Sequence, residues 1–254
     1  MLICRRKIKP VWFSKTAFVI AVLGLPPVYI TSVHYEHVNG LFPFVSSFGV
    51  FSPEKHWFRV LMISYALFNM AGNCFWFMIA RSKIVNMTQS IIPHIINSSI
   101  RLLMIISGLC LIGLSIFDME NYNETHYLMT IGNFTCHVLS ILFGCCLVAK
   151  YFEKPFWFSC FRLMLIVKMI IGAMSFVYFN VIGLPLLSTL NIYRMKPTDG
   201  GYWEFLYCAI AEWVLVLACI LFTLIIALET QTYEDILVRS KTRNITTIQL
   251  MKQV

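Results

Sequence analysis

Residues 204–228 read EFLYCAIAEWVLVLACILFTLIIAL, and a run of this length and composition decides the fold class. As a helix, about 20 such residues are enough to cross the ~30 Å hydrocarbon core of a bilayer. Five more apolar runs of comparable length cover residues 11–33, 57–80, 99–117, 126–151 and 163–187. The sequence therefore predicts an all-α polytopic membrane protein, with six transmembrane helices in one bundle over residues 1–228 and a tail over 229–254.

The positive charges sort onto one side of these six runs. Sixteen of the 20 Lys and Arg residues fall in one set of alternate loops and helix ends, and the other side holds only Lys55, Arg59, Arg194 and Lys196. Because cytosolic loops of membrane proteins are enriched in Lys and Arg, both termini are predicted to be cytosolic. The tail is then a cytosolic segment that either extends the last helix or frays.

Composition agrees with a membrane protein and argues against a nucleic-acid partner. The chain is 59% hydrophobic and 13% charged, with a mean hydropathy of +0.75. Its net charge of +8 comes from residues at helix ends, where they suit the anionic cytosolic face of a membrane. We therefore expect membrane lipids as partners, no nucleic acid and no cofactor.

The longest outer loop, residues 34–56, is rich in aromatic side chains, glycine and proline. Such a loop is too apolar to float free, so we expect it to fold onto the mouth of the bundle or to lie at the interface. Another outer loop, residues 118–125, carries the sequon Asn123-Glu124-Thr125, which makes Asn123 a candidate for glycosylation.

Several motifs resemble the Frag/DRAM/Sfk family, which contains damage-regulated autophagy modulators, Sfk-type plasma-membrane proteins and post-GPI-attachment remodelling factors. The motifs are Phe42-Pro43-Phe44-Val45-Ser46-Ser47-Phe48-Gly49, Ser52-Pro53-Glu54, Arg81-Ser82-Lys83, Gly200-Gly201-Tyr202 and Ala211-Glu212-Trp213. The resemblance covers most of the chain and implies the same six-helix layout and a role in lipid handling. It also implies that Glu54 helps to fix the first loop, whose motif residues are Phe42, Pro43, Ser46, Gly49, Pro53 and Glu54.

Glu212 is the one acidic residue deep inside a predicted span. An ionisable group at that depth costs several kcal/mol unless it is paired or hydrated, so it should face the bundle interior. His137, Asn69 and Asn73 lie at similar depths and are the predicted partners of an intramembrane polar cluster. This cluster is either a clasp that fixes helix packing or a site for protons or lipid headgroups.

The outer side also collects histidines and carboxylates, including His34, Glu36 and His37. They could in principle bind a metal or form a hydrolase site, but no known catalytic motif is present. We expect solvated interfacial residues here, with no catalytic residues and no metal.

Three functions follow from these observations. The first is a non-catalytic accessory or scaffold subunit that recruits or organises lipid-handling machinery, such as phosphoinositide, phospholipid or GPI-lipid homeostasis or lipid transfer, bound to another membrane protein. The second is a GPI-anchor lipid remodelling factor or enzyme. The third is a lipid or ion translocator that uses Glu212. The compartment is the plasma membrane or an endomembrane of the endoplasmic reticulum, Golgi or lysosome.

Overall fold

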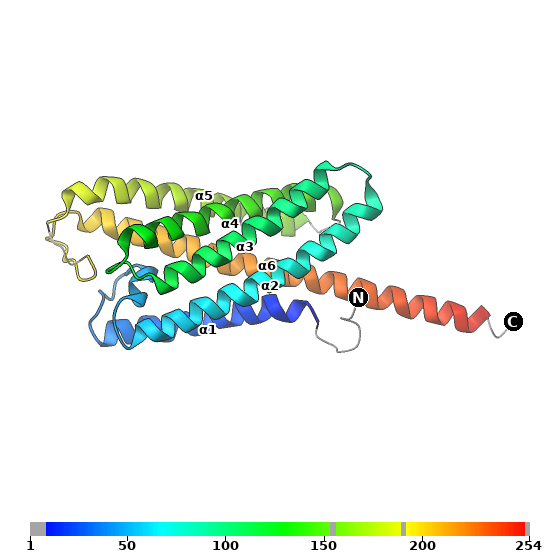
Figure 1. Ribbon diagram of the computed structural model, residues 1–254, viewed down its shortest axis with the longest axis horizontal. Helices are drawn as coiled ribbons and strands as arrows, with labels where there is room; N and C mark the ends of the chain where they lie inside the picture. The colour runs from blue at the N-terminus through cyan, green and yellow to red at the C-terminus, as the bar shows by residue number, and fades with distance from the viewer. Residues whose placement is uncertain (1–8, 153–155, 189–191, 252–254) are drawn as a thin grey trace.

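The computed structural model describes residues 9–152, 156–188 and 192–251, with side chains as far as residue 234. Six long helices lie side by side along one axis (Figure 1). They are α1 (Val11–His34), α2 (Glu54–Met87), α3 (Ile92–Ile116), α4 (Asn123–Tyr151), α5 (Phe156–Gly183) and α6 (Tyr202–Met251), with the short 3-10 helices η1 (Val45–Gly49) and η2 (Leu184–Leu186).

Each of the six helices is long and apolar enough to span a membrane. This confirms the predicted all-α class. The helix bounds differ from the predicted runs mainly at the ends: α2 continues to Met87, and α3 begins at Ile92. Pro26 and Pro27 do not stop α1, which continues to His34. The tail predicted from residue 229 is the continuation of α6 as far as Met251, and residues 252–254 lie outside the described part.

Three helices begin with an acidic residue in the first turn: Glu54 in α2, Glu124 in α4 and Glu204 in α6. A carboxylate stabilises a helix N-terminus because it complements the partial positive charge of the exposed N–H groups. All three of these helix starts lie at the same end of the bundle, the left end in Figure 1. We call this the loop end, because the first loop also lies there.

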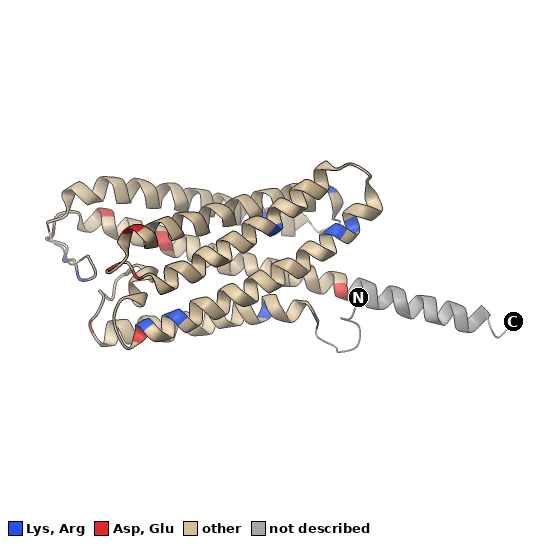
Figure 2. Cartoon of the chain, viewed as in Figure 1, with Lys and Arg blue, Asp and Glu red and all other residues tan. Residues whose placement is uncertain are grey.

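α1 begins, and α6 leaves the bundle, at the opposite end (Figure 1). Most charged residues lie toward the two ends of the helices, and the lengths between them are largely uncharged (Figure 2). The fold therefore places α1's start and α6's exit on one side of a membrane. That this side is cytosolic stays a prediction, and residues 1–8, with Arg5, Arg6 and Lys7, lie outside the described part.

The bundle is closed by helix pairs in direct contact: each long helix with the next one along the chain, and α6 also with α1 and α2. Small residues allow some of these approaches. A Cβ atom at Gly108 would lie 2.4 Å from the Met70 side chain, and one at Gly72 would lie 2.2 Å from the Ser14 hydroxyl. On the outside, large apolar side chains such as Leu23, Val60 and Met174 are exposed, as expected for surfaces that face lipid.

Candidate functional site

The first loop folds into the mouth of the bundle and closes it. Residues 43–50, including all of η1, are buried, and the Phe48 ring packs edge-on against Tyr29, Phe58 and Trp213. The aromatic content of the loop favours this plug, because the hydrophobic free energy gained by burying these rings offsets the conformational entropy lost when the loop is ordered. The sequence leaves two locations open for this loop, the mouth of the bundle and the membrane interface. In the structure the loop lies at the mouth of the bundle.

Two adjacent residues of α6 hold this plug. Glu212 is 4% exposed, and its Oε2 accepts a hydrogen bond from the backbone nitrogen of Val45 at 2.7 Å. The Trp213 indole Nε1 donates to the Pro43 carbonyl oxygen at 2.8 Å. The N–H groups at the start of η1 have no acceptor within that helix. They point toward the Glu212 carboxylate, and such a helix start favours a negative charge. Two motifs that the resemblance identifies separately are therefore in contact.

This geometry corrects the predicted polar cluster. The sequence assigns Glu212 to His137, Asn69 or Asn73, whereas its hydrogen bond is to a backbone group of the first loop. Backbone donors carry no sequence signature, so residue types along the helices could not reveal this partner. The sequence offered only an indirect signal for this contact. The loop motif and the pair Glu212-Trp213 both carry polar or aromatic residues, whereas positions that face lipid are usually aliphatic.

The asparagines instead form a line of hydrogen bonds between α2 and α6. Asn73 Nδ2 donates to Asn69 Oδ1 at 3.0 Å, and Thr223 Oγ1 on α6 lies 3.3 Å from the same oxygen. The Tyr65 hydroxyl extends the line, 3.0 Å from Thr223. These contacts satisfy polar groups within the bundle and join the two helices.

His137 belongs to a different group, on α3 and α4. Its Nδ1 lies 3.4 Å from the Ser107 hydroxyl, which donates to Asn133 Oδ1 at 2.9 Å. His137 is 3% exposed, and its Nε2 has no hydrogen-bond partner. A buried ring nitrogen without a partner is costly, and such groups call for a specific explanation.

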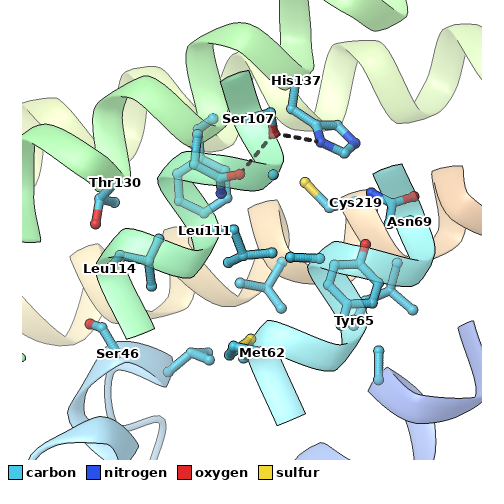
Figure 3. Close-up of a pocket in the computed structure, with 18 of the residues that line it drawn as sticks. Ser46, Met62, Tyr65, Asn69, Ser107, Leu111, Leu114, Thr130, His137 and Cys219 are labelled. Atoms are coloured by element: carbon cyan, nitrogen blue, oxygen red, sulfur yellow. Dashed lines mark hydrogen bonds between the residues drawn. The ribbon is translucent and has the colours of Figure 1, made fainter. Parts of the chain in front are cut away.

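Glu212, Asn69 and His137 nevertheless line one central cavity of about 60 Å³. Figure 3 shows it between Ser46 of the plug and His137, with Tyr65, Leu111 and Cys219 between them. Residues of α1, α2, α3, α4 and α6 form the wall. Asn73 is not part of this wall and lines a second, smaller cavity of about 10 Å³ toward the other end of the bundle.

The outer histidines and carboxylates serve mainly to tie loops together. His37 Nδ1 pairs with the buried Glu54 carboxylate at 2.5 Å, which joins the two ends of the first loop. Lys55 pairs with Asp118 at 2.7 Å, and Arg59 bonds the Ser115 and Ile116 carbonyls at the end of α3. His34 and Glu36 are exposed. Among the described residues, no group of three or more His, Cys, Asp or Glu has a metal-binding arrangement.

The other predicted site residues divide by burial. In the first-loop motif, Pro43, Ser46, Gly49 and Glu54 are buried, whereas Phe42 and Pro53 are exposed. Asn123 is exposed and is the first residue of α4, where the sequence places it in the preceding loop. Its glycosylation stays a prediction.

A buried ion pair near the opposite end of the bundle was not predicted. Arg162 of α5 and Glu229 of α6 pair at 2.8 Å with side chains 2% and 0% exposed, and Trp76 Nε1 donates to the same carboxylate at 2.6 Å. The charge pattern places Arg162 with the Lys and Arg residues of the predicted cytosolic side, and Glu229 is the first residue of the predicted tail. A signal did exist, since Glu229 follows the apolar run of α6 without a turn-forming residue.

A helical bundle with apolar outer faces and a few polar groups buried in an apolar interior defines the class: a multi-pass membrane protein. Within that class, residues 11–233 match the Frag1/DRAM/Sfk1/Cwh43P N-terminal domain, and the chain belongs to this family. The match confirms the resemblance. No curated protein and no solved structure matches the chain.

Proposed function

We propose that the protein is a non-catalytic accessory or scaffold subunit, which docks another membrane protein of a lipid-handling complex through its first loop. The observation that carries this proposal is the division of the loop into a buried plug and an exposed apolar edge. Leu41 and Phe42 are 58% and 50% exposed, directly before the buried residues 43–50. Exposed apolar side chains on a rigid support suit contacts with a partner.

The polar groups of the loop end support the same proposal. His37, Glu54, Lys55 and Asp118 hold loops to helices and to one another. Residues used in this way position the edge formed by Leu41 and Phe42. A nucleophile or base also needs a pocket that holds the substrate next to it.

The experiment is capture of partners from cells that express the tagged full chain, followed by rescue of lipid composition in cells that lack it. Leu41→Ser and Phe42→Ser together should reduce partner capture and rescue. Leu184→Ser, at an exposed residue of η2, is the matched control and should change neither. All variants are compared at equal expression and equal thermal stability.

The alternative of a lipid-remodelling enzyme is tested with the exposed groups His34, Glu36 and His56, each changed to Ala. These substitutions leave the loop contacts of Glu54 and His37 intact. If one of them abolishes a lipid conversion while partner capture continues, the subunit proposal is wrong and the remodelling enzyme replaces it.

A translocator is the second candidate, because Glu212, Asn69 and His137 line one cavity and Asn73 and Arg162 line the next along the bundle. Reconstitution into vesicles tests it. Proton or lipid movement that depends on Glu212 would favour the translocator over the subunit.

A further inference from the structure

Two cysteine thiols are exposed on the outer surface of the bundle. Of the eight cysteines in the described part of the chain, Cys146 of α4 and Cys160 of α5 are exposed, and the other six are buried or half-buried. α4 ends at Tyr151 and α5 begins at Phe156, so both thiols lie at the same end of the bundle. Each is about 6–8 Å from that end of its helix.

This end of the bundle has the side chains of a membrane interface. Phe156 and Trp157 are 84% and 63% exposed at the start of α5, and Lys150 is exposed near the end of α4. Exposed aromatic rings and lysines are typical of the level of the lipid headgroups. The two thiols therefore lie just below the headgroups, on the side that the charge pattern predicts to be cytosolic. Cysteines at this level are the ones that accept fatty acyl chains.

An apolar groove begins farther along the same face of α4. It lies between α4 and α5, has a volume of about 280 Å³ and is lined by residues that include Thr135, Leu139 and Met174. Leu139 is seven residues before Cys146, and Thr135 is eleven before it. With 3.6 residues per turn, both lie within about 20° of Cys146 around the helix axis. The groove therefore follows α4 inward from this thiol, away from the headgroups.

A chain attached to Cys146 has the length needed to reach this groove. Leu139 lies about 10 Å from Cys146 along the helix, and Thr135 about 16 Å. One leaflet of the hydrocarbon core is about 15 Å deep, which is the depth that one long acyl chain fills. A chain on Cys146 therefore runs beside α4 and ends in the groove. Attachment holds such a chain in register with the groove, whereas a free bilayer chain has no fixed position.

The other thiols differ in exposure and depth. Cys145 is half-buried and lies next to Arg162 of α5. Cys74 and Cys136 are half-buried, and each is about 20 Å from the same end of its helix. An enzyme that transfers an acyl group at the membrane surface does not reach that depth. We therefore expect these three thiols to stay free.

We propose that Cys146 and Cys160 are sites of S-acylation by long-chain fatty acids, and that the chain on Cys146 lies in the groove between α4 and α5. The cysteine thiolate attacks the thioester carbonyl of a long-chain acyl-coenzyme A, with a membrane acyltransferase as catalyst. A carbon–sulfur bond to the cysteine forms, the bond to coenzyme A breaks, and the coenzyme A sulfur takes up the proton that the cysteine lost. This inference goes beyond the proposed function and does not rest on it.

The first test counts acylated thiols on the tagged full chain from cells. Free thiols are blocked, thioesters are cleaved with hydroxylamine, and each released thiol is coupled to a polyethylene glycol maleimide, which slows the protein in a gel by one step. Cys146→Ala and Cys160→Ala should each remove one hydroxylamine-dependent step, and the double variant should remove two. Cys145→Ala is the matched control and should remove none. Cys4 lies outside the described part of the chain and is unchanged in all of these variants.

The second test locates the chain on Cys146. Cells are fed a palmitate analogue with a diazirine in the middle of its chain, and the purified protein is irradiated in nanodiscs. Mass spectrometry should find the Cys146 peptide cross-linked to residues 131–139 or 170–177. Ala173→Trp fills the groove and should abolish this cross-link without removing a gel step. Val181→Trp, at an exposed position of α5 outside the groove, should change neither.

Two results would overturn the inference. One is a double variant that keeps every hydroxylamine-dependent step of the unaltered protein. The other is an acylated Cys146 whose chain cross-links to bilayer lipid and not to the groove. Both cysteine side chains are exposed, so the alanine variants should fold, and a lost step reports the missing thiol. Size-exclusion profiles of the purified variants check this.

Discussion

Glu212 on α6 and Val45 at the start of η1 are 167 positions apart in the chain, and the carboxylate accepts a hydrogen bond from the Val45 backbone nitrogen at 2.7 Å. This contact joins the last helix to the first loop. With the bond from Trp213 to Pro43, it holds the plug over the central cavity. The loop end is therefore stabilised from inside the bundle.

Substitution of Glu212 tests this contact. The unfolding midpoint of Glu212→Gln should be close to that of the unaltered protein, because the amide oxygen still accepts the hydrogen bond and no charge is buried. Glu212→Leu should lose about 1–3 kcal/mol of stability, because the N–H groups of η1 remain buried without an acceptor. Thermal unfolding in mild detergent measures both. Equal midpoints for the two variants would show that the bond does not hold the plug.

The Arg162–Glu229 pair should be the most sensitive polar contact among those described here. Arg162→Met leaves a buried carboxylate without its cation, and the expected loss is about 3–5 kcal/mol. The double variant Arg162→Met, Glu229→Met should recover part of that loss, because no uncompensated charge remains. Lys168→Met, at an exposed lysine of the same helix, is the control. A double variant less stable than Arg162→Met would contradict this account.

Two glycines of the first loop offer a matched pair for testing the plug. A Cβ at Gly49 would lie 2.9 Å from the Phe58 ring, whereas one at Gly40 would lie 3.7 Å from Val33. Gly49→Ala should therefore destabilise by about 1–3 kcal/mol through overpacking. Gly40→Ala should have little effect. Limited proteolysis of the loop gives a second measurement, with faster cleavage expected only in Gly49→Ala.

Asp118 gives the loop end a dependence on pH. Burial acts to raise its pKa, but the hydrogen bonds from Lys55 and Asn121 outweigh this and hold the pKa below its ordinary value of 3.8. Because the folded pKa is lowered, the stabilisation is present above the ordinary value and is lost as the pH falls through the folded pKa. Asp118→Asn should flatten the fall in unfolding midpoint below about pH 4, and an unchanged pH profile in this variant would contradict the account.

The membrane orientation is testable with tags. The excess of Lys and Arg at one end predicts that residues 88–91 between α2 and α3, and both termini, face the cytosol. In sealed vesicles with an exposed cytosolic face, added protease should then remove tags at these positions without permeabilisation of the membrane. Protection of a tag at the C-terminus in vesicles with an exposed cytosolic face would reverse the orientation.

The polar interior separates what the sequence could and could not predict about the site. Burial of Glu212 followed from the cost of placing a carboxylate in hydrocarbon, which depends on its depth alone. Its partner did not follow, because any polar group at the same depth satisfies that requirement. The same applies to Arg162, whose position near a helix end agrees equally with snorkelling to the interface and with a buried pair.

The sequence by itself determined the six helices and the placement of their starts and ends at alternate ends of the bundle. Each apolar run is a local property, and the bilayer requires every backbone group within it to bond inside its own helix. Only the tertiary structure decided that the first loop plugs the bundle, that Glu212 holds Val45 and that Arg162 holds Glu229. These contacts join residues far apart in the chain, and which groups meet depends on how the helices are rotated and packed against one another.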